Sequence, residues 1–332
     1  MQRAERDQAR PRRVLVTGAG GFVGRHLCAK LAAHGHVVHA LVRAPADVAG
    51  ASRVSVVGDL VVFDAWREVL ADCDAVVHLA ALTHASGLDD SAAWPRFVAL
   101  NVDVTRRLAV AACAAGVTNF VFLSSIKVNG EQSPRAGASW HRFSAADPPR
   151  PEDNYGRSKR DAEDALAEIA AASAMRVSVL RPPLLYGPGM KGNLPQLLRA
   201  VARRRPLPLA SVRNCRSLLA VDNLVAAIEA ALARAPRGAC TYTLADVDLS
   251  TPELVRALAA ALGVAPRLWP CPVTLLRLLG ALSGRRGAID RLTGSLVVER
   301  EAIATALDWQ PSSSFEEVLL ATARAWREEA AR

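Results

Sequence analysis

The stretch that most constrains this chain is VLVTGAGGFVG, which runs from Val14 to Gly24 near the N-terminus. A short apolar strand leads into a glycine turn, and an amphipathic helix is expected over residues 21–34. Gly18 allows a positive φ, Gly21 lets the backbone approach a ligand, and Gly24 lets the helix pack closely on the strand. Because the helix N-terminus then presents free N–H groups to an anion, the stretch predicts a bound dinucleotide pyrophosphate rather than a plain glycine-rich turn.

Length and composition indicate an ordinary globular protein. The 332 residues exceed one average domain but suit an α/β core with an attached lobe. No uninterrupted apolar run approaches the ~18 residues that would span a bilayer. Residues 1–13 are charged and lack an apolar signal region, so we expect a disordered basic tail over residues 1–12, residence in the cytoplasm and no membrane insertion.

The net charge of +9 raises the question of a nucleic-acid partner. The tail contributes five arginines against two acids, and a second cluster lies over residues 199–216. The remaining charge is spread along the chain with no nucleic-acid-binding motif, so we expect no nucleic acid. The six cysteines show no CxxC pairing and no histidine clustering, which disfavours a disulfide framework or a zinc site.

Apolar strands alternate with helical segments along the first half of the chain. Strands are expected at residues 37–42, 54–57, 75–79, 119–123 and 176–180, and helices at 64–70, 91–115 and 153–174. Strands buried on both faces and separated by helices predict a doubly wound parallel sheet, an α/β fold. Right-handed crossovers place the carboxyl ends of the strands, and therefore the ligand, along one edge of that sheet.

The second half of the chain has a different pattern, with proline- and glycine-rich segments between shorter elements. We expect a dinucleotide-binding domain over residues 13–182, to which residues 217–246 return, and a smaller α/β substrate lobe formed by 183–216 and 247–332. The apolar stretch over residues 268–282 is interrupted by two prolines and an arginine, so it predicts a packing helix rather than a membrane anchor.

A phenol and an ammonium group stand one helical turn apart in the segment Tyr155-Gly-Arg-Ser-Lys159. A nearby Lys⁺ favours the phenolate and is expected to lower the pKa of Tyr155, which makes this residue a candidate general acid/base. Ser124 and Ser125 end a strand and would bring a hydroxyl to the same cleft edge. The Tyr-x₃-Lys spacing is common by itself. Here it follows the glycine turn, HLAA (78–81) and the serine pair in that order, and this ordered set is a specific signal.

The chain resembles the extended short-chain dehydrogenase/reductases, in particular the nucleotide-sugar epimerase/reductase branch, from Val14 to about Leu319. This resemblance implies a Rossmann sheet, an NAD(P) cofactor, a UDP-linked sugar as partner and possible homodimers. It rests on TGAGGFVG (17–24), GDL (58–60), HLAA (78–81), Asn101, SSIKVNG (124–130), YGRSK (155–159), LRPPLLYGPG (180–189), RSLLAVDNL (216–224) and LDWQP (307–311).

The family pattern also implies a role for each matching residue. Catalysis would fall to Ser125, Tyr155 and Lys159, with Lys159 also holding the nicotinamide ribose. The cofactor would lie against Gly18, Gly21, Phe22, Val23, Gly24, Arg43, Asp59, Leu60, Ala80, Ala81 and Asn101, the last supporting the active-site helix. The substrate would contact Ser124, with its diphosphate on Asn193, Arg216 and Arg291; a surface role is the alternative for Arg291.

Two departures from the family pattern bear on the reaction and the cofactor. Ile126 and Lys127 stand where 4,6-dehydratases carry an acidic pair, which disfavours dehydration. Arg43 stands near the end of the second strand, where NAD-preferring members carry an aspartate. An arginine there attracts a 2′-phosphate, so the sequence favours NADP, unless Arg43 is simply a solvated loop charge.

These observations predict oxidoreduction at C4 of a UDP-hexose or UDP-N-acetylhexosamine. The reaction is either 4-epimerisation or reduction of a 4-keto-6-deoxy sugar for surface polysaccharides, and the catalytic residues serve both. The alternatives are an NADPH-dependent reductase of an apolar ketone and a non-catalytic NAD(P)-binding regulator. His78 is expected to be a packed neutral residue, whereas His84 and His141 could reach the substrate or face solvent.

Overall fold

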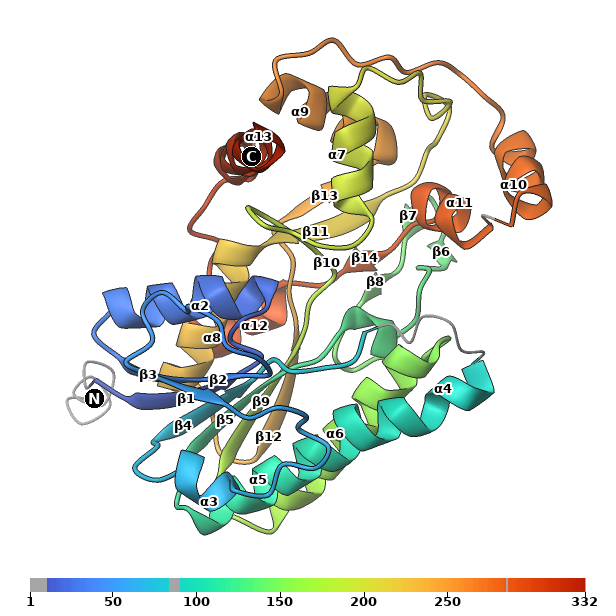
Figure 1. Cartoon of the computed structure of the whole chain (residues 1–332). Helices are drawn as coiled ribbons and strands as arrows, with labels where there is room; N and C mark the ends of the chain where they lie inside the picture. The colour runs from blue at the N-terminus through green and yellow to red at the C-terminus, as the bar shows by residue number, and fades with distance from the viewer. Residues whose placement is uncertain (1–10, 84–89, 285, 332) are drawn as a thin grey trace.

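A computed structural model describes residues 11–83, 90–284 and 286–331 (Figure 1). Residues 1–10 of the predicted tail and His84 lie outside this part of the chain. A large sheet with helices on both faces forms one layered unit, and a smaller lobe covers one end of it (Figure 1).

The large sheet has seven strands, and all of its pairings are parallel. The strands, in spatial order, are β12 (Ala239–Thr243), β9 (Arg176–Arg181), β5 (Asn119–Leu123), β4 (Ala75–His78), β1 (Arg13–Thr17), β2 (Val37–Val42) and β3 (Arg53–Val56). The predicted doubly wound parallel sheet is confirmed. The order reverses at β1, which is the switch point where such sheets bind ligands beyond the carboxyl ends of their strands.

Each face of the sheet has its own apolar core. Val14, Val16 and Leu27 belong to one core, and Leu15, Leu108 and Phe120 to the other, because successive strand side chains point to opposite faces. The first core is covered by α2 (Phe22–Ala33), α8 (Val221–Arg234) and α12 (Glu301–Leu307). The second is covered by α3 (Trp66–Val69), α5 (Val104–Ala114) and α6 (Asn154–Ala171).

The helix expected over residues 91–115 is not one regular helix. It consists of α4 (Asp90–Phe97), the π-helical turn η1 (Val98–Asp103) and α5. Pro95 lies inside α4 and removes a backbone donor from the helical ladder just before the π-helical turn. Such turns are rare and often occur at functional sites, and this one carries Asn101.

The small lobe is built on a three-stranded sheet of β10 (Leu184–Tyr186), β11 (Arg216–Ala220) and β13 (Val247–Leu249). The helices α7 (Leu194–Ala202), α9 (Thr251–Ala261) and α13 (Phe315–Ala331) complete it. Of residues 217–246, α8 and β12 do lie with the large sheet, but β11 differs from our expectation. Leu218 of β11 packs into the small-lobe core while Leu219 packs into the core under α2, so this strand joins the two units.

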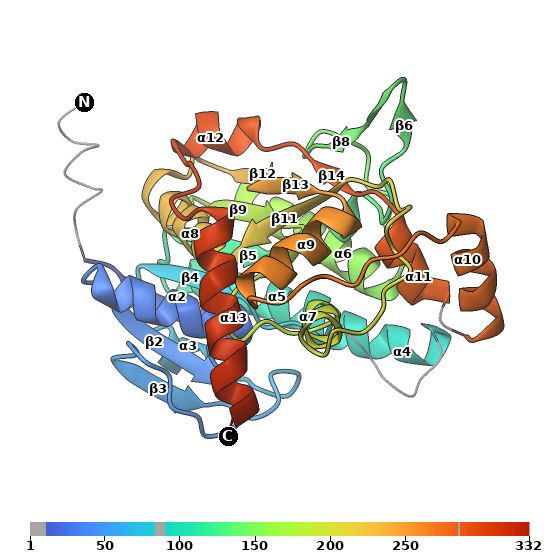
Figure 2. The same ribbon diagram turned by 90° about the horizontal axis from the view of Figure 1, so that it is seen from above.

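Several shorter elements connect the lobes. The 3₁₀ turn η2 (Ile126–Val128) follows β5, β6 (Arg135–Ala136) pairs with β7 (Ser139–Trp140), and β8 (Arg142–Phe143) pairs with β14 (Val297–Val298). The helices α10 (Val273–Leu282) and α11 (Arg286–Thr293) project together from the edge of the small lobe (Figures 1 and 2). In the described part of the chain, no helix combines the length and apolar composition needed to cross a membrane.

Candidate active site

A pocket of about 260 Å³ opens at the carboxyl edge of the large sheet. Its walls are the β1–α2 turn, the end of β5, the first turns of α6 and the segment that enters β10. Among the residues expected from sequence, it is lined by Gly18, Gly21, Phe22, Val23, Gly24, Ala81, Ser124, Ser125, Tyr155 and Lys159. The pocket therefore brings the predicted dinucleotide cradle and the predicted catalytic residues together.

The glycine turn is shaped so that only glycine fits at two of its positions. Gly18 has a φ of +69°, and a Cβ there would lie 2.8 Å from the backbone nitrogen of Ala80. A Cβ on Gly24 would overlap the carbonyl oxygen of Gly18. Gly21 caps α2 without a side chain, which leaves the N–H groups of the first helical turn available to an anion. This cradle fits the pyrophosphate of a dinucleotide.

A buried hydrogen-bonded chain holds the opposite wall of the cradle. Thr17 Oγ1 accepts from the backbone nitrogens of Leu79 (3.2 Å) and Ala80 (3.3 Å) and lies 2.6 Å from His78 Nδ1. His78 Nε2 lies 3.0 Å from Thr105 Oγ1, which donates onward to a backbone carbonyl. His78 is therefore neutral with its proton on Nε2, and burial followed by the charge of Lys159 lowers its pKa to about 3. His78 positions Ala80, which itself does not line the pocket.

Asn101 acts from behind the site and does not contact the pocket. Its Nδ2 donates to Ser158 Oγ (2.8 Å) and to the carbonyl of Leu82 (2.9 Å), and its Oδ1 accepts from the nitrogen of Leu82 (2.7 Å). The side chain is 1% exposed. Its polar atoms are bonded to the protein, so Asn101 ties the segment after β4 to α6, in agreement with its expected support of the active-site helix; a direct contact of Asn101 with the cofactor stays a prediction.

Tyr155 lies on the first turn of α6, whose start is fixed by its neighbours. Asp153 caps the helix and accepts from the nitrogen of Gly156 at 2.7 Å. A Cβ on Gly156 would lie 2.7 Å from the carbonyl oxygen of Lys127, so glycine lets α6 approach the loop after β5. That approach brings Tyr155 into the same pocket as Ser125, whose side chain favours the phenolate form of Tyr155.

The expected effect of Lys159 on Tyr155 was wrong for the site in this structure. Burial, together with the charge of Asp153, raises the pKa of Tyr155, and only the hydrogen bond from Ser125 opposes the increase. Burial lowers the pKa of Lys159 to about 7, although Glu163 favours its charged form. Lys159 Nζ donates to the carbonyl of Leu123 at 2.8 Å and lies 5.9 Å from the centroid of the Tyr155 ring. Removing both groups from water outweighs their proximity.

Behind the catalytic residues lies a buried ionic network that the sequence analysis missed. Arg181 Nε donates to Glu163 Oε1 at 3.0 Å, and Arg181 Nη1 donates to Asn129 Oδ1 at 3.1 Å. Ser124 lines the pocket, as expected, but its hydroxyl donates to Glu163; its contact with the substrate stays a prediction. The signal was present, because Glu163 follows Lys159 by one helical turn on the same face of α6.

The residues expected at the adenosine end lie beyond the pocket. Arg43 is exposed after β2, and its side chain forms no hydrogen bond or ion pair with another described residue. Asp59 is exposed, and its Oδ1 accepts from the nitrogen of Val61 at 2.9 Å. The carbonyl of Leu60 accepts from Arg107 Nη2 at 3.0 Å. The structure therefore leaves the guanidinium of Arg43 free for an anion.

Two of the three residues expected at the substrate diphosphate come together in the small lobe. Arg216 begins β11, is half-buried, and donates to the carbonyl of Gly294 at 3.2 Å. Burial lowers the pKa of Arg216; the charge of Glu131 opposes this decrease, and the charge of nearby Arg291 on α11 adds to it. Among the described residues, no carboxylate lies within ion-pair distance of either arginine. Asn193 is exposed at the N-terminus of α7 and belongs to a different part of the lobe.

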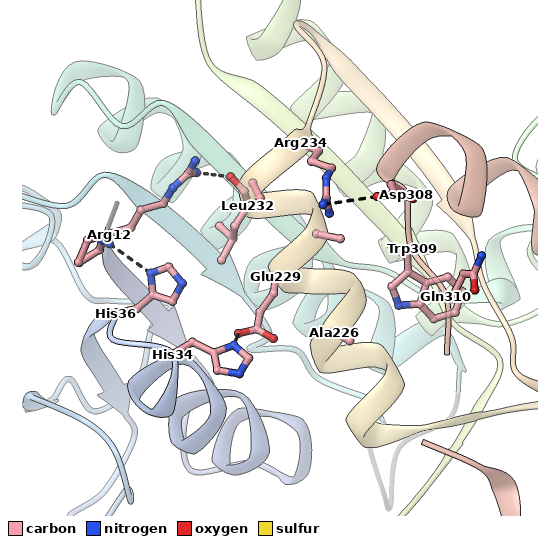
Figure 3. A pocket seen from close by; sticks show the side chains of 13 residues that line it. Arg12, His34, His36, Ala226, Glu229, Leu232, Arg234, Asp308, Trp309 and Gln310 are labelled. Atoms are coloured by element: carbon pink, nitrogen blue, oxygen red, sulfur yellow. Dashed lines mark hydrogen bonds and ion pairs between the residues drawn. The ribbon is translucent and has the colours of Figure 1, made fainter. Parts of the chain in front are cut away.

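A larger pocket of about 420 Å³ lies at the opposite end of β1, between α2, α8 and residues 308–310 (Figure 3). Its polar groups bind one another: His34 Nδ1 lies 2.6 Å from Glu229 Oε1, and Arg234 Nη2 lies 3.5 Å from Asp308 Oδ2 (Figure 3). It is at the amino end of the strands and holds no hydroxyl–lysine pair. We therefore assign the chemistry to the smaller pocket.

Comparisons with known proteins identify the family of this chain. A model of the NAD dependent epimerase/dehydratase family matches residues 14–245. The chain is 36% identical over 325 residues to a UDP-glucose 4-epimerase of Vibrio cholerae, covering 96% of this chain and 97% of the relative. It is 31% identical over 318 residues to a ceramide reductase of Caulobacter vibrioides, covering 91% and 86% of the two chains.

A solved structure gives the same result for the fold. The chain is similar to MoeE5 in complex with UDP-glucuronic acid and NAD, with a TM-score of 0.76 and 27% identity over 95% of this chain and 99% of that one. The match includes the small lobe as well as the large sheet. Its fold, its ordered motifs and these relatives together show that the protein belongs to the NAD dependent epimerase/dehydratase family, as an enzyme of the extended short-chain dehydrogenase/reductase type.

Proposed function

We propose that the protein is an NAD(P)-dependent 4-epimerase of a UDP-hexose or UDP-N-acetylhexosamine. The observation that carries this proposal is that Tyr155, Ser125 and Lys159 line one pocket together with the glycine cradle. Support comes from the Vibrio cholerae relative, a UDP-glucose 4-epimerase that matches this chain over almost all of its length.

Each residue of the pocket has a different role in the oxidation at C4. The bound nicotinamide supplies the hydride acceptor and later the donor. The phenolate of Tyr155 would take the proton of the C4 hydroxyl as the C4–H bond breaks, and Ser125 would orient that oxygen by a hydrogen bond. Because burial raises the pKa of Tyr155, this step requires bound cofactor and substrate to favour the phenolate. A cofactor held by the glycine cradle and Lys159 would give the hydride back to the other face of the 4-keto sugar, so no net oxidant or reductant would be consumed, and Tyr155 would return the proton to the C4 oxygen. Lys159, which uses one N–H on Leu123, has two further N–H groups for the nicotinamide ribose.

We further propose that Arg216, with Arg291, binds the UDP diphosphate. Replacing Arg216 by alanine removes charge-assisted hydrogen bonds, so the Kd for UDP should rise roughly 10- to 150-fold. Titration calorimetry with UDP measures this change, and Arg324→Ala, on the exposed surface of α13, is the matched control. An unchanged UDP affinity in Arg216→Ala would remove the sugar-nucleotide assignment and favour an apolar ketone substrate.

We propose that Arg43 gives the enzyme a preference for NADP(H) over NAD(H). Its exposed and unpaired guanidinium at the end of β2 supports this proposal. In Arg43→Asp the carboxylate repels a 2′-phosphate and accepts from ribose hydroxyls, so the ratio of kcat/KM for NADP to that for NAD should fall by on the order of 100-fold. Arg25→Asp, also exposed near the cradle, is the control for a general charge effect. An unchanged ratio would make Arg43 a solvated loop charge.

A 4-ketoreductase is the second candidate, because Arg43 favours the cofactor that cells use for reductions. It would consume one NADPH for each sugar and release NADP. An epimerase instead interconverts the C4 epimers with no net change in nicotinamide absorbance. Incubation with UDP-glucose or UDP-N-acetylglucosamine, followed by proton NMR of the sugar, distinguishes the two reactions. In either case we propose that the product is used in surface-polysaccharide synthesis. We also propose that the enzyme is a homodimer.

A further inference from the structure

The helix α10 does not pack as its sequence suggested. Only Leu276 and Gly280 of this helix are buried. Leu275, Leu278, Leu279 and Leu282 are exposed by 44%, 56%, 53% and 78%. Their spacing of three and four residues places these leucines on one side of the helix, and we call them the apolar stripe.

The stripe is concentrated in one place. Of the twelve large hydrophobic side chains exposed among the described residues, five lie within residues 269–282: the four leucines of the stripe and Trp269, which is 47% exposed. Both ribbon views show α10 at the outer edge of the molecule, with α11 on its inner side (Figures 1 and 2). An exposed apolar cluster of this kind marks a surface that another phase or molecule covers.

The segment that leads into α10 is flanked by positive charge. Arg203, Arg204 and Arg205 are exposed after α7, and we call them, together with exposed Arg267, the basic edge. Backbone hydrogen bonds hold the two segments side by side: Leu207 donates to the carbonyl of Arg267 at 2.8 Å, and Trp269 donates to the carbonyl of Leu207 at 3.1 Å. The basic edge therefore lies along the segment that leads into α10.

Few acids balance these arginines. Residues 183–216 and 263–294 contain twelve basic residues and one acid, Asp290, so their net charge is +11. The whole chain has a net charge of +9, and the rest of the chain therefore has a net charge of −2. Asp290 Oδ1 lies 3.8 Å from Arg277 Nε, and its Oδ2 lies 3.8 Å from Arg286 Nε, so one carboxylate serves two arginines. The surplus charge of the protein is thus concentrated in the lobe that carries the stripe.

We propose that the apolar stripe and the basic edge dock the protein on the surface of a bilayer that contains anionic phospholipid. The leucines would enter the acyl boundary, Trp269 would lie at the headgroup level, and the arginines would pair with lipid phosphates. Charge complementarity favours this occupant over a second copy of the chain, because a copy would bring the same positive lobe against this one. The proposal concerns attachment only and holds whichever C4 reaction the pocket performs.

Co-sedimentation of the full chain with vesicles tests the docking. We expect binding to vesicles of phosphatidylcholine with phosphatidylglycerol, weak binding to phosphatidylcholine alone, and release at high salt. The variant Leu278→Glu/Leu282→Glu should bind the anionic vesicles at least ~10-fold less tightly, because two exposed side chains that would enter the acyl boundary become charged. Substituting Arg203, Arg204 and Arg205 by glutamine should weaken binding on the order of 100-fold.

Matched variants keep the result interpretable. Val62→Glu/Leu320→Glu changes two exposed apolar side chains elsewhere and should bind vesicles like the wild type. Circular dichroism and UDP-sugar turnover in solution report whether the stripe variant is folded, and both should be unchanged. A wild-type chain that stays in the supernatant, or a stripe variant that binds anionic vesicles equally well, overturns the proposal. The proposal is also overturned if analytical ultracentrifugation shows a dimer of the wild type that the stripe variant no longer forms. In that case a second copy of the chain covers the apolar stripe.

Discussion

Tyr155→Phe should lower kcat by about 10²- to 10⁴-fold, which is the range that general acid/base catalysis contributes. The variant loses only the hydroxyl that exchanges a proton with the sugar, so cofactor binding to the glycine cradle should be unchanged. Stopped assays of C4 epimer formation, with cofactor affinity measured by nicotinamide fluorescence, give the two readouts. The loss of kcat is therefore expected without a parallel loss of cofactor affinity.

Tyr186→Phe is the matched control for this experiment. Tyr186 is also buried, but its hydroxyl lies 3.4 Å from Asp246 in the small lobe and is not part of the pocket. This control should keep most of the activity. Full turnover by Tyr155→Phe would mean that another group moves the proton, and the proposed mechanism would then be wrong.

Glu163→Gln should destabilise the folded protein by about 3–5 kcal/mol, because it leaves the buried guanidinium of Arg181 without its carboxylate. Both residues are almost fully buried, with exposed fractions of 7% for Glu163 and 5% for Arg181. Thermal and urea unfolding followed by circular dichroism measure the free energy of unfolding. The double variant Glu163→Leu/Arg181→Met should recover most of the loss, since it removes both charges together.

Asp164→Asn controls for an ordinary ion pair on the same helix. Asp164 pairs with Arg160 at 3.4 Å, and both side chains are largely exposed, so the change should cost less than about 1 kcal/mol. Similar stability losses for Glu163→Gln and Asp164→Asn would show that the buried network contributes no more than a surface pair. In that case Glu163 would have only a local role beside Ser124.

Local sequence patterns were sufficient to predict the large sheet. The strand at residues 37–42 and the strand at 119–123 are found with the expected bounds, because each is a short apolar run between polar turns. The glycine spacing of residues 18–24 also predicted the cradle, since a positive φ at Gly18 and the close approach at Gly24 are demands that only glycine meets. These features depend on neighbouring residues, which a sequence displays directly.

Other features depended on partners distant in the chain. No periodicity showed that β11 would pair with β10 and β13, because its alternating side chains suit either sheet until both cores are in place. Likewise, the family pattern distinguished Ser125 from Ser124, but only the packing of α6 showed that the hydroxyl of Ser124 donates to Glu163. The pKa of Lys159 also depends on its burial, which no local sequence pattern shows.

The sequence by itself determined the order of the motifs, the type of sheet and the positions of Tyr155, Lys159 and the glycine cradle. These features follow from the spacing of residues close in the chain, because each such position requires a residue type with a particular geometry or chemistry. Only the tertiary structure decided which polar groups face the pocket, which are bonded behind it, and that the stripe of α10 stays outside the core. Burial is a property of the whole packed chain. The free-energy cost of removing a charge from water, and the cost of leaving a leucine exposed to water, both depend on that packing.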